Sequence, residues 1–434
     1  MQTLYDLVFI FFSFLYFPYF ILNRKYHREF IQRLGIFSRN SFDKIRRHKI
    51  IWIHAVSVGE VNSALPLWKL LRQNFPQYRI VFSTITKTGN NLAKKFAQPD
   101  EFVVYFPLDF SFIVRRVVKL IHPHLVIILE TELWPNFIAQ CNKIDIPVIL
   151  GNARLSDSSF IRYKLGSPFL SPVLDKINLI LAQTEKDADR LISLGASKNK
   201  VWVSGNMKFD NIDCSDKRID YSDRLRLLLE LSNQDKLLVA GSTHPGEEEI
   251  LLAIYKELLM QFPNLRLLIA PRHIERIPQI EKLVSSYGLS PFRISRLFNP
   301  ASSIQHPVSG VFLLDTIGQL RDFYAIADIV FVGGSLVKRG GHNIIEPAMF
   351  SKPVISGNYF FNFSDIFKVF RDSQAVITCQ NKEGLKSAIS ELLNNPVQAK
   401  ILGERAREVI LKQQGATQKN LEWVSKYLDR NPTF

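Results

Sequence analysis

Short apolar runs alternate with segments of helical periodicity along most of the chain. In the first half these runs predict β-strands at residues 50–53, 80–83, 103–105, 125–129, 148–150, 179–182 and 201–204. Between them, stretches such as 64–75 and 90–96 repeat apolar residues at helical spacing. Strands that alternate with helices in this way predict a parallel sheet with helices on both faces.

The alternation stops over a polar, mixed-charge stretch at residues 210–232 and then begins again. Strands are predicted at residues 236–240, 265–270, 311–314, 329–332 and 353–355, and helices at 247–262, 274–287 and 382–427. A chain of 434 residues is also too long for one ordinary core. We therefore expect an α/β protein with two doubly wound, Rossmann-like domains joined by a linker.

The N-terminal region combines an apolar segment with a strongly basic one. Residues 7–22 carry no charge, and residues 23–50 hold nine Lys and Arg against two acids. The apolar segment lacks the basic start and small-residue cleavage site of a secretory signal. We expect it to span a membrane once or to lie in the interface, with the basic flank holding the chain on the cytoplasmic side.

The net charge of +15 indicates an anionic partner, and nucleic acid, an anionic membrane and a phosphorylated substrate all fit it. The three cysteines are scattered and odd in number, which favours a reducing compartment over disulfides. No group of His, Cys and acidic residues has the spacing of metal ligands, so no metal is expected.

Charged residues follow four predicted strands of the first half. Glu60 lies shortly after the strand at 50–53, and Glu130, Arg154 and Lys208 follow later strands. Ligands of open α/β sheets bind outside the carboxyl ends of the strands, so these side chains could form one site with Glu60 as a proton acceptor. The alternative for Glu60 is a structural role, because acidic residues are favoured in the first turn of a helix.

The second half contains a glycine-rich run at residues 333–347. Its glycines would let the backbone approach a phosphate, and Lys338 and Arg339 add positive charge. A helix starting near His342 would bring Glu346 close to its N-terminus, where a carboxylate could accept hydrogen bonds from a ribose. The run matches neither the Walker A loop nor the dinucleotide fingerprint, and a plain turn is the alternative.

Six motifs in order give the chain a resemblance to the 3-deoxy-D-manno-octulosonic acid (Kdo) transferases of lipopolysaccharide biosynthesis, which are GT-B glycosyltransferases. They are HAVSVGE at 54–60, ETELWPN at 130–136, NARLS at 152–156, GNMKFD at 205–210, PRH at 271–273 and GGSLVKRGGHN at 333–343. The resemblance implies CMP-Kdo as donor and the tetraacyldisaccharide bisphosphate precursor of lipid A (lipid IVA) as acceptor. It also implies inversion at the anomeric carbon without metal or other cofactor.

The resemblance also assigns roles to particular residues. Glu60 would be the general base, and Glu130 and Lys208 would support the transition state. The residues that would hold CMP are Pro271, Arg272, Ile317, Gly318, Gln319, Asn343, Ile344, Ile345 and Glu346. Two positions depart from the family pattern: Gln319 stands where an acid is common, and Ile344-Ile345 replaces Pro-Leu. We expect both isoleucines to face the core.

These inferences divide the chain into five segments. Residues 1–22 form a membrane anchor or interfacial helix, 23–49 a basic juxtamembrane segment, 50–210 the acceptor-binding domain, 211–235 the linker and 236–434 the CMP-sugar-binding domain, whose last helix could pack back on the first domain. The expected location is the cytoplasmic side of the inner membrane, with an anionic membrane surface and no nucleic acid as partner. The alternative is another GT-B glycosyltransferase that acts on a membrane lipid.

Overall fold

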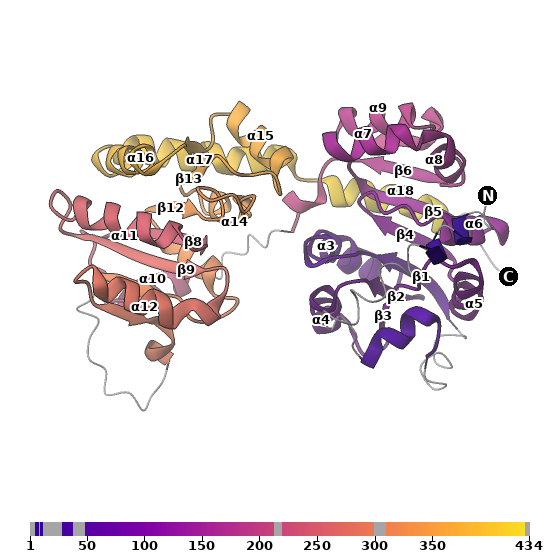
Figure 1. The fold of residues 1–434 in the computed structure, drawn as a ribbon, viewed down its shortest axis with the longest axis horizontal. Helices are drawn as coiled ribbons and strands as arrows, with labels where there is room; N and C mark the ends of the chain where they lie inside the picture. Colours follow the sequence, from indigo (N-terminus) through magenta and orange to yellow (C-terminus); the bar gives the residue numbers. More distant parts are fainter. Residues whose placement is uncertain are drawn as a thin grey trace. The chain divides into compact units, whose positions relative to one another are not determined.

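The chain folds into two compact units, Met1–Asn211 with Gln413–Phe434, and Ile212–Lys412 (Figure 1). The structure, a computed structural model, describes residues 5–7, 9–11, 28–37, 48–211, 219–298 and 310–429. Most of the predicted apolar segment 7–22 and of the basic segment 23–49 therefore lies outside the described residues. Within the described residues, no helix has both the length and the apolar character needed to cross a membrane.

The first unit is built on a parallel sheet with the strand order β3-β2-β1-β4-β5-β6-β7. The strands are β1 Lys49–His54, β2 Tyr78–Thr84, β3 Phe102–Tyr105, β4 Leu125–Leu129, β5 Val148–Ala153, β6 Leu179–Ala182 and β7 Val201–Val203. The order runs outward in one direction from β1 to β3 and in the other from β4 to β7. This reversal creates a topological switch point between β1 and β4, where ligands of such sheets bind.

Helices cover both faces of this sheet (Figure 1). They are α3 Val58–Asn74, α4 Lys87–Phe96, α5 Ser111–Ile121, α6 Pro135–Lys143, α7 Asp157–Leu165, α8 Ser167–Leu174, α9 Glu185–Ser193 and α18 Ala416–Asp429, with short 3-10 turns η1 Arg28–Leu34, η2 Lys198–Lys200 and η3 Met207–Phe209. Alternate residues of β1 enter separate cores, since Trp52 packs in one cluster and Ile51 and Ile53 in the other. The C-terminal helix α18 contributes Leu421 and Val424 to the second cluster.

The second unit repeats the architecture with a parallel sheet of order β10-β11-β9-β8-β12-β13-β14. Its strands are β8 Lys236–Thr243, β9 Leu265–Pro271, β10 Pro291–Arg293, β11 Val311–Leu313, β12 Ile329–Val332, β13 Val354–Gly357 and β14 Ile377–Cys379. Its helices are α10 Ile219–Leu228, α11 Glu247–Leu258, α12 Ile277–Ser286, α13 Leu320–Ile326, α14 Ile345–Met349, α15 Ser364–Asp372, α16 Lys382–Asn394 and α17 Pro396–Gln413, with turns η5 Ile274–Arg276 and η6 Ile294–Phe298. Its switch point lies between β8 and β12.

The twelve predicted strands all exist, and the structure adds β10 and β14. Each of these two strands has three residues at an edge of the sheet, and their sequences, Pro-Phe-Arg and Ile-Thr-Cys, do not form an apolar run. The long helical pattern at 382–427 is divided into α16, α17 and α18, with Pro396 opening α17 and Gly415 adopting a φ of +98° before α18. The expected helix near His342 begins only at Ile345 and is five residues long.

Candidate functional site

Glu60 lies at the switch point of the first sheet, in the first turn of α3. One carboxylate oxygen accepts a hydrogen bond from the Val56 amide at 2.7 Å, and the other accepts one from the Ser57 hydroxyl at 3.0 Å. The residue is 8% exposed. Burial and then the negative charge of Glu130 raise the pKa of Glu60 to about 7, against the opposing hydrogen bonds.

Glu130 follows β4 directly, on the other side of the switch point. Its Oε1 accepts a hydrogen bond from Lys208 Nζ at 2.8 Å, and its Oε2 lies 3.2 Å from Arg154 Nε. Burial by itself would raise the pKa of Glu130, but Lys208 and Arg154 lower it below the ordinary value. Two neighbouring carboxyl groups thus differ in protonation: Glu130 stays ionised, while Glu60 titrates near neutral pH.

Unusual backbone conformations and hydrogen bonds to two asparagine side chains fix the loops around this cluster. Glu130 adopts a φ of +57°, which is costly for a residue with a side chain and is typical of functional sites. The amide side chain of Asn152, whose φ is +52°, accepts a hydrogen bond from the Met207 amide at 3.0 Å. Asn206 accepts one from the Lys208 amide at 2.9 Å. The two asparagines therefore fix the backbone from which Lys208 reaches Glu130.

His54 ends β1 close to Glu60 in sequence but has a structural environment. Its Nδ1 lies 3.0 Å from the Ser83 hydroxyl, and its ring stacks on Phe106 at 3.9 Å. Complete burial lowers the pKa of His54 to about 3. The imidazole is therefore neutral and shut off from solvent, which leaves Glu60 as the group suited to accept a proton.

The glycine-rich loop of the second unit encloses an internal carboxylate. Glu247, the first residue of α11, is fully buried and accepts hydrogen bonds from the amides of His244, Gly334, Ser335 and Leu336 at 2.7–3.0 Å. We expected the glycines at 333, 334, 340 and 341 to let the backbone approach a phosphate. For Gly334 that prediction is wrong, because the buried carboxylate of Glu247 takes its amide together with those of Ser335 and Leu336.

Imidazole and guanidinium groups gather at the switch point of the second sheet. His244 follows β8 and His342 follows β12; their Nε2 atoms lie 2.9 Å apart and their rings are stacked. His273 lies edge-on to His244, with ring centroids 6.0 Å apart. Burial, followed by the charge of Arg272, lowers the pKa of His342 to about 4. This concentration of positive charge and N–H donors suits an anionic ligand.

Asn343 and Glu346 lie beside this basic cluster. Asn343 Nδ2 donates to Glu346 Oε1 at 3.2 Å, and Asn343 Oδ1 accepts a hydrogen bond from the Ile345 amide. Burial raises the pKa of Glu346, while Asn343, Arg321 and Arg272 act in the opposite direction. Ile344 and Ile345 are buried, as predicted from the sequence.

The segment Ile317-Gly-Gln319 precedes α13, the helix that brings Arg321 near Glu346. Gly318 has a φ of +93°, and Ile317 is 83% exposed. The Thr316 hydroxyl donates to the Gln319 side chain, which therefore has a local partner. Pro271 ends β9, and the Arg272 amide donates to the Thr243 carbonyl at 3.0 Å, which joins the ends of β8 and β9.

Sequence reasoning missed three contributors to this arrangement. His244 and Glu247 lie at the turn before a predicted helix and His273 lies in the PRH motif, but the sequence assigns no role to any of the three side chains. Their spacing carries no signal, since the partners lie almost a hundred residues apart, as with His244 and His342. Among the described residues, no group of three or more His, Cys, Asp and Glu side chains could hold a metal ion.

The chain matches known proteins over most of its length. Residues 28–211 match the 3-deoxy-D-manno-octulosonic-acid transferase (kdotransferase) family, and residues 308–409 match the glycosyl transferases group 1. The 3-deoxy-D-manno-octulosonic acid transferase of Haemophilus influenzae is 38% identical over 94% of this chain and 93% of that protein. The enzyme of the same name from Chlamydia trachomatis serovar A is 30% identical over 86% of this chain and 84% of that protein.

A solved structure shares the fold at low identity. UDP-GlcNAc 2-epimerase from Neisseria meningitidis, bound to UDP-GlcNAc, superposes with a TM-score of 0.57 and 14% identity over 88% of this chain and 100% of that one. This likeness concerns the fold alone and agrees with two Rossmann-like units of GT-B type. By its sequence relatives, the chain belongs to the 3-deoxy-D-manno-octulosonic acid transferases, the glycosyltransferases that transfer Kdo in lipopolysaccharide biosynthesis.

Proposed function

We propose that the protein transfers Kdo from CMP-Kdo to a hydroxyl of lipid IVA, with inversion and with Glu60 as general base. The observation that carries this proposal is the environment of Glu60: a buried carboxylate at a switch point, with a pKa raised to about 7 and an ionised Glu130 nearby. A general base works best when its pKa is close to the working pH.

In the proposed step, an acceptor hydroxyl loses its proton to Glu60. The hydroxyl oxygen forms a bond to the anomeric carbon of Kdo, and the bond between that carbon and the CMP phosphate oxygen breaks. CMP leaves with the electron pair. Lys208 and Arg154, fixed on Glu130, supply positive charge for the anionic groups of the reacting sugar and phosphate.

The second unit would hold the nucleotide. Arg272 lies in the basic cluster with His244 and His342, which suits the phosphate of CMP. Glu346, oriented by Asn343, can accept hydrogen bonds from ribose hydroxyls. Pro271, Ile317, Gly318 and Gln319 would complete the CMP site through their backbone, while buried Ile344 and Ile345 would support it from the core. No metal is part of this proposal.

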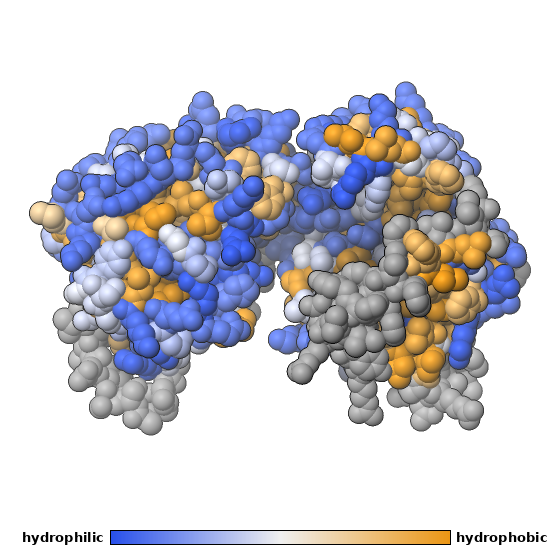
Figure 2. Space-filling model, viewed as in Figure 1, coloured by the Kyte–Doolittle hydropathy of each residue, from blue (hydrophilic) through white to orange (hydrophobic). Residues whose placement is uncertain are grey.

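A lipid acceptor requires a membrane surface, and the start of the chain supports one. Asp6 accepts hydrogen bonds from the Ser111 amide at 3.1 Å and from Asn136 Nδ2 at 2.7 Å, so it attaches to the first turns of α5 and α6 at the carboxyl edge of the first sheet. Leu7, Phe11 and Phe112 are each at least 60% exposed, and Figure 2 shows further hydrophobic residues on the surface of the first unit. Apolar side chains at this edge favour attachment to the cytoplasmic face of the inner membrane.

The proposal can be tested by incubating the protein with CMP-Kdo and lipid IVA and determining the products by mass spectrometry. We expect the wild-type protein to add Kdo and to release CMP. The Glu60→Gln variant should still bind CMP but should transfer no Kdo. A thermal-shift comparison addresses the other possibility, a GT-B enzyme with a different donor. Stabilisation by UDP instead of CMP would refute the proposed donor.

A further inference from the structure

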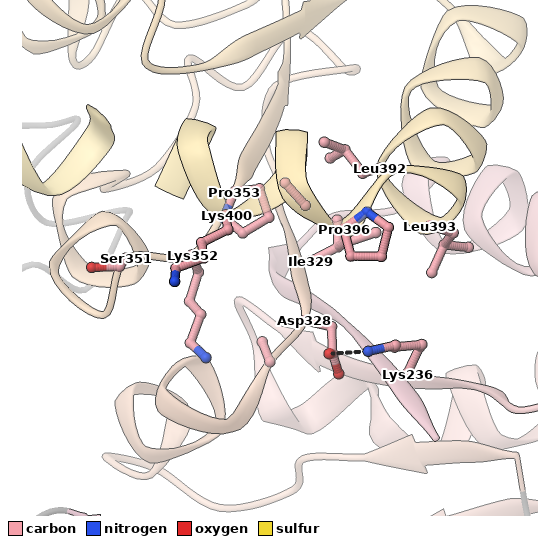
Figure 3. Close-up of a pocket in the computed structure, with 12 residues that line it drawn as sticks. Lys236, Asp328, Ile329, Ser351, Lys352, Pro353, Leu392, Leu393, Pro396 and Lys400 are labelled. Atoms are coloured by element: carbon pink, nitrogen blue, oxygen red, sulfur yellow. Dashed lines mark hydrogen bonds and ion pairs between the residues drawn. The ribbon is translucent and has the colours of Figure 1, made fainter. Parts of the chain in front are cut away.

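A pocket of about 280 Å³ lies in the second unit, away from the basic cluster (Figure 3). Its walls come from the residues at the amino ends of β8, β12 and β13, the end of α16 and the start of α17. The loops that carry His244 and His342 follow the carboxyl ends of β8 and β12. In a parallel sheet these are opposite edges, so the pocket is distinct from the proposed donor site.

Lysines outnumber acids in this pocket. Lys236, Lys352 and Lys400 line it together with a single acid, Asp328. Asp328 is already satisfied: Lys236 Nζ lies 3.2 Å from Oδ1, as the dashed line in Figure 3 marks, and the Leu237 amide donates to Oδ2 at 2.9 Å. Arg226 Nη1 lies 3.8 Å from the same Oδ2. The negative charge of Asp328 therefore only partly offsets the effect of burial on Lys352, whose pKa stays below its ordinary value.

Lys352 is half-buried, and within the described residues its ammonium group has no ion pair. Burial lowers the pKa of Lys352, as expected for a cation removed from water. Its backbone is held in place, because a Cβ at Gly403 would collide with the Ser351 carbonyl, so α17 lies directly against this loop. A fixed, half-buried cation among other cations is stabilised when an anion binds.

Apart from Ser351 the remaining wall is apolar, with Pro353, Leu392 and Pro396 lining the space beside the lysines (Figure 3). The start of α17, an 18-residue helix, adds the positive end of its dipole. We propose that this pocket binds a small phosphate monoester, with the phosphate against Lys352 and Lys236 and a short apolar substituent against Leu392 and Pro396. This inference does not depend on the proposed reaction.

Isothermal titration with butyl phosphate tests the site on the full-length chain. We expect saturable binding at one site, weakened at least about tenfold in Lys352→Met, which keeps the apolar stem and removes the charge. Lys386→Met is the matched control, because Lys386 is exposed in the same unit and pairs with Glu257. Arg272→Met separates the pocket from the donor site and should bind butyl phosphate normally.

Two further measurements, of thermal melting and of inorganic phosphate binding, complete the test. Thermal melting of each variant shows whether it is folded, and inorganic phosphate should bind more weakly than butyl phosphate because it lacks the apolar part. Equal binding by wild type and Lys352→Met, equal loss in Lys386→Met, loss in Arg272→Met, or no saturable binding would each overturn the proposal.

Vesicles of phosphatidylcholine and phosphatidylglycerol distinguish the source of the phosphate. Weaker sedimentation of Lys352→Met than of wild type with these vesicles, together with release of wild type by butyl phosphate, would assign the site to a lipid headgroup. Equal sedimentation alongside lost butyl phosphate binding would assign it to a soluble phosphate monoester.

Discussion

The pKa of Glu60 provides the sharpest test of the proposed chemistry. A base with a pKa of about 7 is mostly protonated at pH 6 and mostly ionised at pH 8. We therefore expect kcat/KM for Kdo transfer to rise about tenfold between these pH values and to level off above them. A carboxyl group with the ordinary pKa of 4.5 would give no change over this range.

The cause of the shift can be tested by removing the charge of Glu130. In Glu130→Gln the maximal rate should fall, because Lys208 and Arg154 lose their partner, but the acid limb of the pH profile should move to lower pH. Glu185→Gln is the matched control: this residue is an exposed glutamate on α9, and the same change there should leave the limb in place. The assay is CMP release at limiting acceptor in buffers of constant ionic strength.

The same shift has a consequence for stability. A rise in pKa from 4.5 to about 7 corresponds to about 3 kcal/mol. The folded state holds the proton more tightly than the unfolded state, so this contribution is present below pH 4.5 and is lost as the pH rises through 7. Glu60→Gln should therefore gain stability over wild type between pH 5 and pH 8 in urea unfolding. A flat pH–rate profile combined with an unchanged stability difference would refute the reasoning.

Three further predictions concern the second unit and the expected activity without a metal ion. Arg272→Ala should raise the KM for CMP-Kdo at least about tenfold with a smaller effect on kcat, because it removes a cation from the basic cluster; an unchanged donor KM would contradict the placement of CMP. Glu247→Gln should destabilise the second unit by about 2 kcal/mol in urea unfolding, since an amide side chain has one acceptor oxygen for the four amides that the carboxylate satisfies, and Glu249→Gln on the same helix is the control. Activity should persist in excess EDTA, and loss of activity that Mg²⁺ restores would show that a metal takes part.

Much of the fold can be read from the order of apolar runs. Apolar runs locate twelve of the strands, such as β1 and β4, whose side chains are almost all buried. The strands β10 and β14 have the sequences Pro-Phe-Arg and Ile-Thr-Cys, which form no apolar run, and they are defined by pairing to a neighbour. The assignment of α18 to the first unit likewise depends on packing of Leu421 and Val424, which no local pattern reveals.

For the first cluster, the sequence predicts that Glu60, Glu130, Arg154 and Lys208 share one edge, because parallel strands end on the same side. It does not predict which charges pair. Only the tertiary structure places both cations on Glu130 and, among the residues that it describes, pairs none with the buried Glu60. This difference is what separates the pKa values of the two carboxyl groups.

In the second unit, the sequence around the glycines at 333 and 334 fits a phosphate-binding loop and a turn around a carboxylate equally well. The choice depends on Glu247, which lies almost ninety residues earlier and occupies the amides first. Residue types and strand order thus determine where polar groups gather. Distances between residues far apart in the chain decide which of them are satisfied internally and which remain available to a substrate.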